Sequence, residues 1–166
     1  MYGYERFTPH AELTNFEVRL IVAGTRDYDD YAFFSECMDA HVERFFKGKS
    51  ICFITGRART GADDMIVRWC DERGFPIAAF PADWDLYGKG AGYIRNTEMA
   101  KHATDLVTFY DGRSKGTRHM VEAAIKRSIV PVTIIIDIKK DESHVQHQPQ
   151  SSRSSDPGVR GETVAW

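Results

Sequence analysis

The chain has 166 residues, of which 42% are hydrophobic and 28% charged, and its formal net charge at pH 7 is -2. This length and composition are typical of one globular domain with a hydrophobic core, and the slight acidity argues against a general nucleic-acid binder. No apolar run approaches the roughly 20 residues of a membrane helix, and the first residues lack the pattern of a signal peptide. We therefore expect a cytoplasmic protein with no membrane partner.

Five apolar runs alternate with segments of helical periodicity. The predicted strands are residues 16–23, 51–55, 76–80, 105–110 and 130–136. Helices are expected over about 29–47, 62–73, 93–102 and 117–127, with a long glycine-rich loop over 81–92. This alternation predicts an α/β fold: a Rossmann-like doubly wound sheet of about five mainly parallel strands, with helices on both faces.

Composition divides the chain into three parts. Residues 1–15 form an irregular N-terminal extension, and residues 16–138 form the domain. Residues 139–166 are polar and rich in serine, which predicts a flexible tail. Cys37, Cys52 and Cys70 lie in apolar stretches without a CxxC pair, so we expect buried thiols and no metal site.

The most informative stretch begins with the predicted strand Ile51–Thr55, which leads into the glycine-punctuated loop 56–61 and then a helix. Backbone N–H groups in such a turn favour a bound anion, usually a phosphate. The glycine spacing resembles a Walker A motif, but Ala62 and Asp63 stand where that motif needs Lys and Ser or Thr. An ATPase or GTPase is therefore disfavoured, and the lack of GxGxxG after the first strand disfavours an NAD-dependent dehydrogenase.

Each glycine-rich loop follows a predicted strand: residues 24–26, 56–61, 88–92 and 112–116. Loops after parallel strands meet at one edge of the sheet, where ligands bind. Basic side chains are concentrated in these loops and at the helix starts: Arg26, Arg57, Arg59, Lys89, Arg95, Arg113, Lys115 and Arg118. A basic pocket on a slightly acidic chain favours a small anionic ligand. The alternative is that the glycines serve turn geometry alone and the basic side chains face water.

Three further residues have two interpretations each. Trp84 either stacks on a nucleobase at the pocket lip or packs against the sheet edge. Arg95 and Asn96 either reach a phosphate or ribose, or form salt bridges with Asp83 or Asp85.

Four strings occur in order along the chain: AGTRDY, TGRARTGAD, FPADWDLYGKGAGYIRNTEMA and FYDGRSKGTRHMVEAA. Together they resemble the SLOG superfamily in its YspA or cpYpsA-related branch, over about residues 18–136. The resemblance implies a Rossmann-like domain that binds a nucleotide or a nucleotide-derived ligand. The superfamily includes the LOG enzymes, which cleave the N-glycosidic bond of nucleoside monophosphates, the DNA-processing protein DprA, and proposed sensors of NAD- or ADP-ribose-type signals in bacterial and phage conflict systems.

The resemblance carries over to specific positions. By motif position, the ligand site would include Gly24, Thr25, Arg26, Gly56, Arg57, Gly61, Asp63, Arg95, Asn96, Gly112, Ser114, Gly116 and Thr117. The same loops add Ala58, Arg59, Thr60, Trp84, Asp111 and Lys115.

Two departures from the family pattern affect the functional prediction. The LOG enzymes have PGGxGTxxE with an assisting glutamate, whereas the nearest acid here, Glu122, is displaced by about half a helical turn, which disfavours hydrolysis. In the second loop, Arg57 stands where a glycine is frequent, and Thr60 resembles a one-residue insertion.

We therefore predict a module that binds a phosphorylated nucleoside, ADP-ribose or cyclic-nucleotide type of ligand as a sensor or sequestering protein, without a further cofactor. The alternative is a nucleotide N-glycosidase in which Asp63, Asp83 or Glu122 supplies the catalytic carboxylate. A weaker alternative is single-stranded DNA binding by analogy with DprA, against which stand the acidic balance and the few loop aromatics. We also expect a homo-oligomer, either a dimer or a tetramer.

Overall fold

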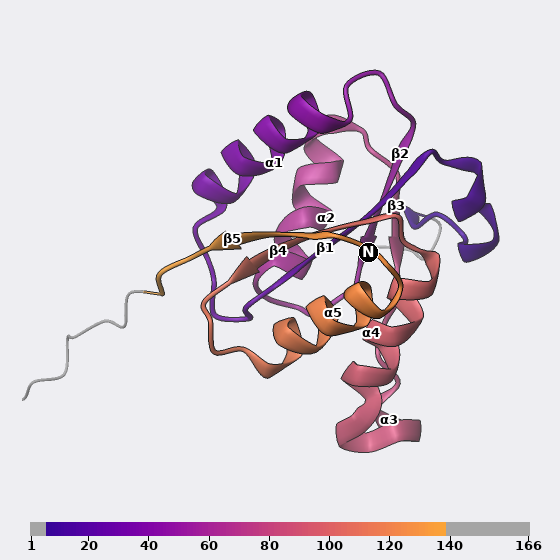
Figure 1. The fold of residues 1–166 in the computed structure, drawn as a ribbon, viewed down its shortest axis with the longest axis vertical. Coiled ribbons are helices and arrows are strands. Elements are labelled where there is room, and N and C mark those ends of the chain that lie inside the picture. Colours follow the sequence, from indigo (N-terminus) through magenta and orange to yellow (C-terminus); the bar gives the residue numbers. More distant parts are fainter. Residues whose placement is uncertain (1–5, 139–166) are drawn as a thin grey trace, which may run out of the picture.

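The computed structural model describes residues 6–138, so the predicted tail 139–166 lies outside the described residues. Its centre is a five-stranded sheet in the order β3-β2-β1-β4-β5, and all four neighbouring pairs are parallel (Figure 1). The strands are β1 (Val18–Gly24), β2 (Ile51–Thr55), β3 (Ile77–Ala79), β4 (Asp105–Tyr110) and β5 (Pro131–Ile135). The chain order reverses beside β1, and such a switch point opens a crevice at the carboxyl ends of the strands.

Two pairs of helices cover the two faces of the sheet (Figure 1). On one face, α1 (Tyr31–Phe45) and α2 (Ala62–Arg73) bury Phe34 and Trp69 against the sheet. On the other, α4 (Ala91–His102) and α5 (Lys115–Lys126) bury Met99 and Met120. The predicted doubly wound α/β architecture is confirmed.

The segment after β3 differs from the prediction. Residues 81–92 do not form one loop, because α3 (Trp84–Tyr87) and the 3-10 helix η3 (Gly88–Gly90) occupy most of it, and α4 begins at Ala91. The Asp83 carboxylate starts α3 by accepting a hydrogen bond from the Leu86 amide at 2.9 Å. This local cap stabilises a helical turn in a segment whose three glycines had indicated irregular backbone.

The start of α5 also differs from the prediction, which began this helix at about residue 117. The cap is Ser114, whose Oγ accepts a hydrogen bond from the Thr117 amide, and the helix begins at Lys115. A serine three residues before the amide that it binds is the usual N-cap geometry.

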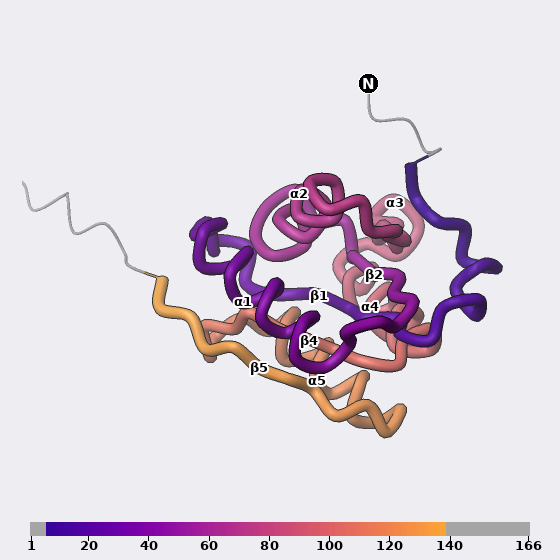
Figure 2. The backbone as a smooth tube through the Cα atoms, turned by 90° about the horizontal axis from the view of Figure 1, so that it is seen from above, coloured from indigo at the N-terminus to yellow at the C-terminus, as the bar shows by residue number. Residues whose placement is uncertain are grey.

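The described part of the N-terminal segment packs on the outer edge of the sheet. Its residues His10–Asn15 form a 3-10 helix, η2, and Leu13 is fully buried. The Thr8 amide donates to the Ile77 carbonyl of β3 at 2.8 Å, and the His10 ring stacks on Phe80 at 3.8 Å. Seen from above, this indigo segment lies on the opposite side of the molecule from the orange β5 (Figure 2).

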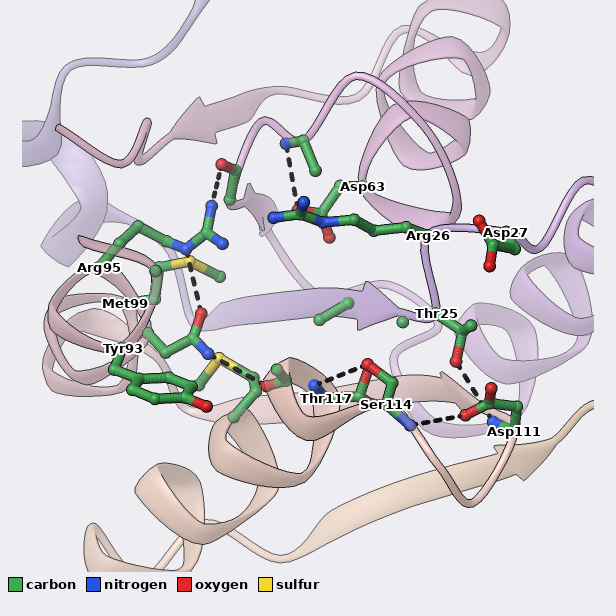
Figure 3. Close-up of a pocket in the computed structure, with 18 of the residues that line it drawn as sticks. Thr25, Arg26, Asp27, Asp63, Tyr93, Arg95, Met99, Asp111, Ser114 and Thr117 are labelled. Atoms are coloured by element: carbon green, nitrogen blue, oxygen red, sulfur yellow. Dashed lines mark hydrogen bonds between the residues drawn. The ribbon is translucent and has the colours of Figure 1, made fainter. Parts of the chain in front are cut away.

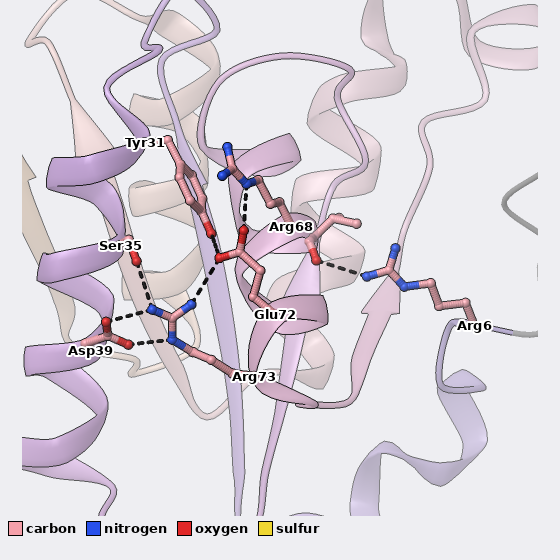
Figure 4. Close-up of polar contacts among 8 residues, drawn as sticks. Arg6, Tyr31, Ser35, Asp39, Arg68, Glu72 and Arg73 are labelled. Atoms are coloured by element: carbon pink, nitrogen blue, oxygen red, sulfur yellow. Dashed lines mark hydrogen bonds and ion pairs between the residues drawn. The ribbon is translucent and has the colours of Figure 1, made fainter.

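A polar network joins α1 to α2 (Figure 4). The Arg73 guanidinium donates two hydrogen bonds to Asp39, at 2.6 and 2.7 Å, and one to Ser35 at 2.9 Å. The hydroxyl of Tyr31 donates to Glu72 at 2.5 Å. The two helices are thereby fixed to each other on the face away from the pocket described below, and a forked guanidinium–carboxylate pair also fixes their relative orientation.

The cysteines lie in or beside the core without disulfides: Cys52 and Cys70 are buried, and Cys37 is half-buried. Within residues 6–138, no helix has the length and apolar character needed to cross a membrane. The same residues contain no group of His, Cys, Asp and Glu side chains that could hold a metal ion.

Candidate functional site

A cavity of about 480 Å³ lies at the carboxyl ends of the central strands, between α4 and α5 (Figure 3). The loops after β1, β2 and β4 all contribute to its wall. The sequence-predicted residues that line it are Gly24, Thr25, Arg26, Gly56, Ala58, Asp63, Trp84, Arg95, Asn96, Asp111, Ser114, Gly116 and Thr117. The structure therefore brings thirteen residues from the three loops and their following helix starts, and from α3 and α4, into one space.

Hydrogen bonds join the loops after β1 and β4. The amide of the buried Thr25 donates to the Phe109 carbonyl at 3.0 Å, and its Oγ1 accepts from the Asp111 amide at 3.3 Å. The Asp111 carboxylate in turn accepts the amides of Arg113 and Ser114, both at 2.9 Å. Although desolvation would raise the pKa of Asp111, these N–H donors outweigh it and the pKa is lowered.

The start of α5 provides the anion-binding geometry. The first amides of a helix have no intrahelical acceptor, and Ser114 satisfies only that of Thr117. The amides of Lys115 and Gly116 have no side-chain acceptor among residues 6–138, and Gly116 lines the cavity. Two N–H donors and the positive end of the helix dipole therefore lie where an anion can bind.

The side chains of Thr55 and Asp63 hold the loop after β2 in place. The buried Thr55 hydroxyl donates to the Asp63 carbonyl at 2.9 Å and accepts the Arg57 amide at 3.1 Å. The Asp63 carboxylate accepts the Ala58 amide at 3.2 Å. Asp63 therefore positions the loop after β2.

Arg95 and Asn96 connect this loop to α5. The Arg95 guanidinium donates to the Gly56 carbonyl and, through Nε, to the Asn96 side chain at 3.0 Å. The Asn96 amide donates to the Gly116 carbonyl at 3.2 Å. A Cβ on Gly56 would displace the Arg95 guanidinium and the Asp63 carboxylate from their present positions, so glycine permits this close approach. The alternative salt bridges from Arg95 to Asp83 or Asp85 are wrong, because this side chain contacts Gly56 and Asn96 instead.

The two buried charges of the site perturb each other. Burial raises the pKa of Asp63 from its ordinary 3.8 to about 6, although the charge of Arg95 and the amide of Ala58 act in the opposite direction. Burial also lowers the pKa of Arg95, which nevertheless remains charged at any physiological pH. At neutral pH the cavity therefore contains an ionised carboxylate beside a guanidinium.

Aromatic side chains border the opening. Trp84 is half-exposed, lines the cavity, and lies 6.0 Å from the Arg26 guanidinium, so it belongs to the lip. Its alternative placement against the sheet edge is wrong. Tyr93 also lines the cavity and stacks on His119 at 4.4 Å.

Comparison with known proteins identifies the family. The model of the YspA, cpYpsA-related SLOG family matches residues 18–87, which contain the loops after β1 and β2. Gene 61 protein of Mycobacterium phage D29 is 34% identical over 117 residues, covering 67% of this chain and 91% of that protein. This chain belongs to the SLOG family.

Among solved structures, this SLOG chain is similar to DNA processing protein A (DprA) from Streptococcus pneumoniae, with a TM-score of 0.60 and 16% sequence identity. The match covers 76% of this chain and 53% of the DprA chain, so this chain spans about half the length of that protein. At this identity the likeness is one of fold.

Of the three carboxylates that the sequence nominated for catalysis in this SLOG domain, only Asp63 lines the cavity. Asp83 instead caps α3. Glu122 lines a separate hollow on the outer surface of α4 and α5, as its displacement from the LOG motif predicts.

Six predicted ligand residues do not line this cavity. Arg57, Arg59 and Thr60 line an adjoining one, and Gly61, Gly112 and Lys115 line neither of the two. Gly61 is needed for close packing, because a Cβ there would collide with the Thr25 carbonyl.

Sequence reasoning did not assign eight lining residues to the site: Ala23, Asp27, Lys89, Gly92, Tyr93, Met99, Arg113 and Met120. The basic cluster in the loops contained Lys89 and Arg113, and Asp27 follows Arg26 directly, so these three had a signal. Met99 and Met120 had none, because a helix residue that lines a cavity has the same periodicity as one that fills the core.

Proposed function

We propose that this SLOG domain binds a nucleotide or a nucleotide-derived signal and acts as a sensor or sequestering module. The observation that carries the proposal is the start of α5: the Gly116 amide lines a cavity that Arg26 and Arg95 also line, and neither it nor the preceding Lys115 amide has a side-chain acceptor within residues 6–138. A phosphate group fits this combination of helix dipole, backbone donors and guanidinium charge.

The remainder of the cavity fits a nucleoside. Trp84 and Tyr93 border it, and an aromatic ring at a pocket lip can stack on a base. The volume of about 480 Å³ lies in the range of small-molecule and cofactor sites. In this arrangement the phosphate binds at α5 and the base lies toward α3 and α4.

Thermal and chemical unfolding with a panel of mononucleotides, ADP-ribose and cyclic nucleotides tests the proposal. A true ligand at 100 times its dissociation constant should raise the free energy of unfolding by about 2.7 kcal/mol. Arg26→Ala should weaken binding, because Arg26 is exposed at the lip and makes no ion pair within residues 6–138, whereas Arg44→Ala on the far end of α1 should not. If no compound in the panel shifts the transition, the proposal is wrong.

A second candidate function is N-glycosidic cleavage of the bound nucleotide. It is favoured by Asp63, a buried carboxylate in the cavity whose pKa is raised to about 6, close to the value that suits a general acid or base at neutral pH. Chromatography after long incubation should then show free base, and Asp63→Asn should abolish its release. Recovery of the intact nucleotide from the wild-type protein would leave binding as the function.

Single-stranded DNA binding is a third hypothesis without an observation in its favour, because the likeness to DprA concerns the fold. Retardation of a single-stranded oligonucleotide by the protein in a native gel would support DNA binding.

A further inference from the structure

A second cavity, which we call the arginine cavity, adjoins the first and has a volume of about 600 Å³. Its lining consists of Arg26, Gly56, Arg57, Ala58, Arg59, Thr60, Pro81, Ala82, Trp84 and Arg95. The main cavity mixes acidic and basic side chains, including Asp27, Asp63 and Asp111. The arginine cavity contains four arginines and no carboxylate in its lining.

Within residues 6–138, none of these four arginines forms an ion pair with a carboxylate, in contrast to Arg6, Arg68 and Arg73. Arg57 lies 5.1 Å from the centre of the Phe7 ring, and Arg26 lies 6.0 Å from that of Trp84. Ring contacts position the guanidinium groups without neutralising them. Asp63 of the main cavity offsets part of the charge of Arg26 and Arg95, but the arginine cavity offers Arg57 and Arg59 no carboxylate in its lining. Like charges around one space repel one another, and a bound anion would relieve that repulsion.

The two cavities are continuous, because both are lined by Arg26, Gly56, Ala58, Trp84 and Arg95. A ligand whose first phosphate binds at α5 can therefore extend past Trp84 toward Arg57 and Arg59. Guanidinium groups bind phosphate oxygens in forked pairs, so phosphate is the anion that four arginines fit best.

From this, resting on the proposed function, we infer that the ligand carries two phosphate groups set apart from each other, and that Arg57 and Arg59 bind the second. Such a ligand is either a nucleoside bisphosphate or a linear dinucleotide. The loop after β2 then decides which nucleotides are selected, and the start of α5 provides the phosphate site that all of them share.

Isothermal titration calorimetry with three probes tests the inference: AMP, adenosine 3′,5′-bisphosphate and the linear dinucleotide pApA. At least one two-phosphate probe should bind the wild-type protein about tenfold or more tightly than AMP, since hydrogen bonds between charged groups contribute on that scale. The probe with the larger advantage distinguishes the bisphosphate from the dinucleotide.

Variants of Arg59 test whether the arginine cavity is the source of the tighter binding of the two-phosphate probe. Arg59 is exposed on its loop, so Arg59→Ala should fold normally and bring the affinity ratio between the two-phosphate probe and AMP toward one. Arg59→Glu should lower the ratio further, because it places a negative charge in the arginine cavity. Arg44→Ala, an exposed arginine on α1, should keep the wild-type ratio.

Each outcome decides between the proposals. A ratio near one in the wild-type protein, or an unchanged ratio in both Arg59 variants, would overturn the second phosphate site while AMP binding upholds the proposed function. If neither AMP nor a two-phosphate probe binds, the second phosphate site is overturned, and the panel with ADP-ribose and cyclic nucleotides decides the proposed function separately.

Discussion

The buried Asp63 makes the stability of the protein depend on pH. Its pKa is raised to about 6 by burial, so the folded protein holds this proton more tightly than the unfolded chain does. Ionisation between about pH 4 and pH 6 therefore lowers the free energy of unfolding, by on the order of 3 kcal/mol. Below this window the contribution is fully present, and above it the contribution is lost.

The Asp63→Asn variant isolates this effect. Asparagine can still accept the Ala58 amide but does not titrate, so the variant should gain about 3 kcal/mol relative to the wild-type protein as the pH rises through the window. Urea unfolding from pH 4 to pH 7 measures the difference. The comparison is needed because carboxylates with lowered pKa values act in the opposite direction: Glu17, Glu72, Glu98 and Asp111. A difference that stays constant with pH would contradict the prediction.

Arg57 has a φ of 60°, in the left-handed region that glycine adopts most readily. A side chain in this conformation costs about 1 kcal/mol relative to glycine. Arg57→Gly should therefore be more stable than Arg57→Ala by about 1 kcal/mol, since both remove the arginine side chain and only the backbone preference differs. At Arg59, where φ is not positive, the same pair of substitutions should show the reverse order in denaturant unfolding. Equal stabilities of the two Arg57 variants would indicate that the loop relaxes.

At the scale of elements, Ser114 caps α5 and also lines the cavity, so its substitution tests the proposed phosphate site. Ser114→Ala removes the cap on Thr117 and should cost about 1 kcal/mol of unfolding free energy. Ser114→Asp keeps a capping oxygen and suits the helix dipole, so the fold should retain its stability. The added charge should repel a phosphate, so AMP binding measured by calorimetry should be lost. Wild-type affinity in the Ser114→Asp variant would place the phosphate elsewhere.

The elements also show how far the sequence predicted this fold. The bounds of β2 and β4 agree with the prediction because both are mainly apolar runs that end at Gly56 and Asp111. The helical turn of α3 was not predicted, because Gly88, Gly90 and Gly92 suggested irregular backbone more strongly than Asp83 suggested a cap. The hydrogen bond from the Leu86 amide to the Asp83 carboxylate therefore stabilises a helical turn, although the nearby glycines favour irregular backbone.

The sequence predicted which loops form the site, but it did not predict how their side chains are arranged. A parallel sheet brings the loops after β1, β2 and β4 to one edge, so Gly24, Gly56 and Ser114 could be placed together from topology alone. Which side of the loop Arg57 and Arg59 face depends on the φ of Arg57 and on contacts with Phe7, a residue 50 positions away in the chain. The division into a mixed-charge cavity and an arginine cavity therefore required the structure.

At the scale of the whole molecule, the sheet leaves its two edge strands in different surroundings. On β5, Val132 and Ile135 are exposed, whereas β3 is covered by the described N-terminal segment. Leu13 of that segment is fully buried with Phe80 and Met99 in the core beneath the site. The segment before residue 16 thus contributes to the same core as α4, although its sequence suggested an extension.

Leu13→Ala tests whether this segment is part of the cooperative unit. Removing a fully buried leucine should lower the free energy of unfolding by about 3 kcal/mol and leave a single transition, because the lost contacts belong to the central core. Leu86→Ala is the matched control: Leu86 is 67% exposed on α3, so its loss should cost less than about 0.5 kcal/mol. Urea unfolding followed by circular dichroism and by tryptophan fluorescence measures both variants. If Leu13→Ala is as stable as Leu86→Ala, the N-terminal segment is a separate extension, and the domain begins near residue 16.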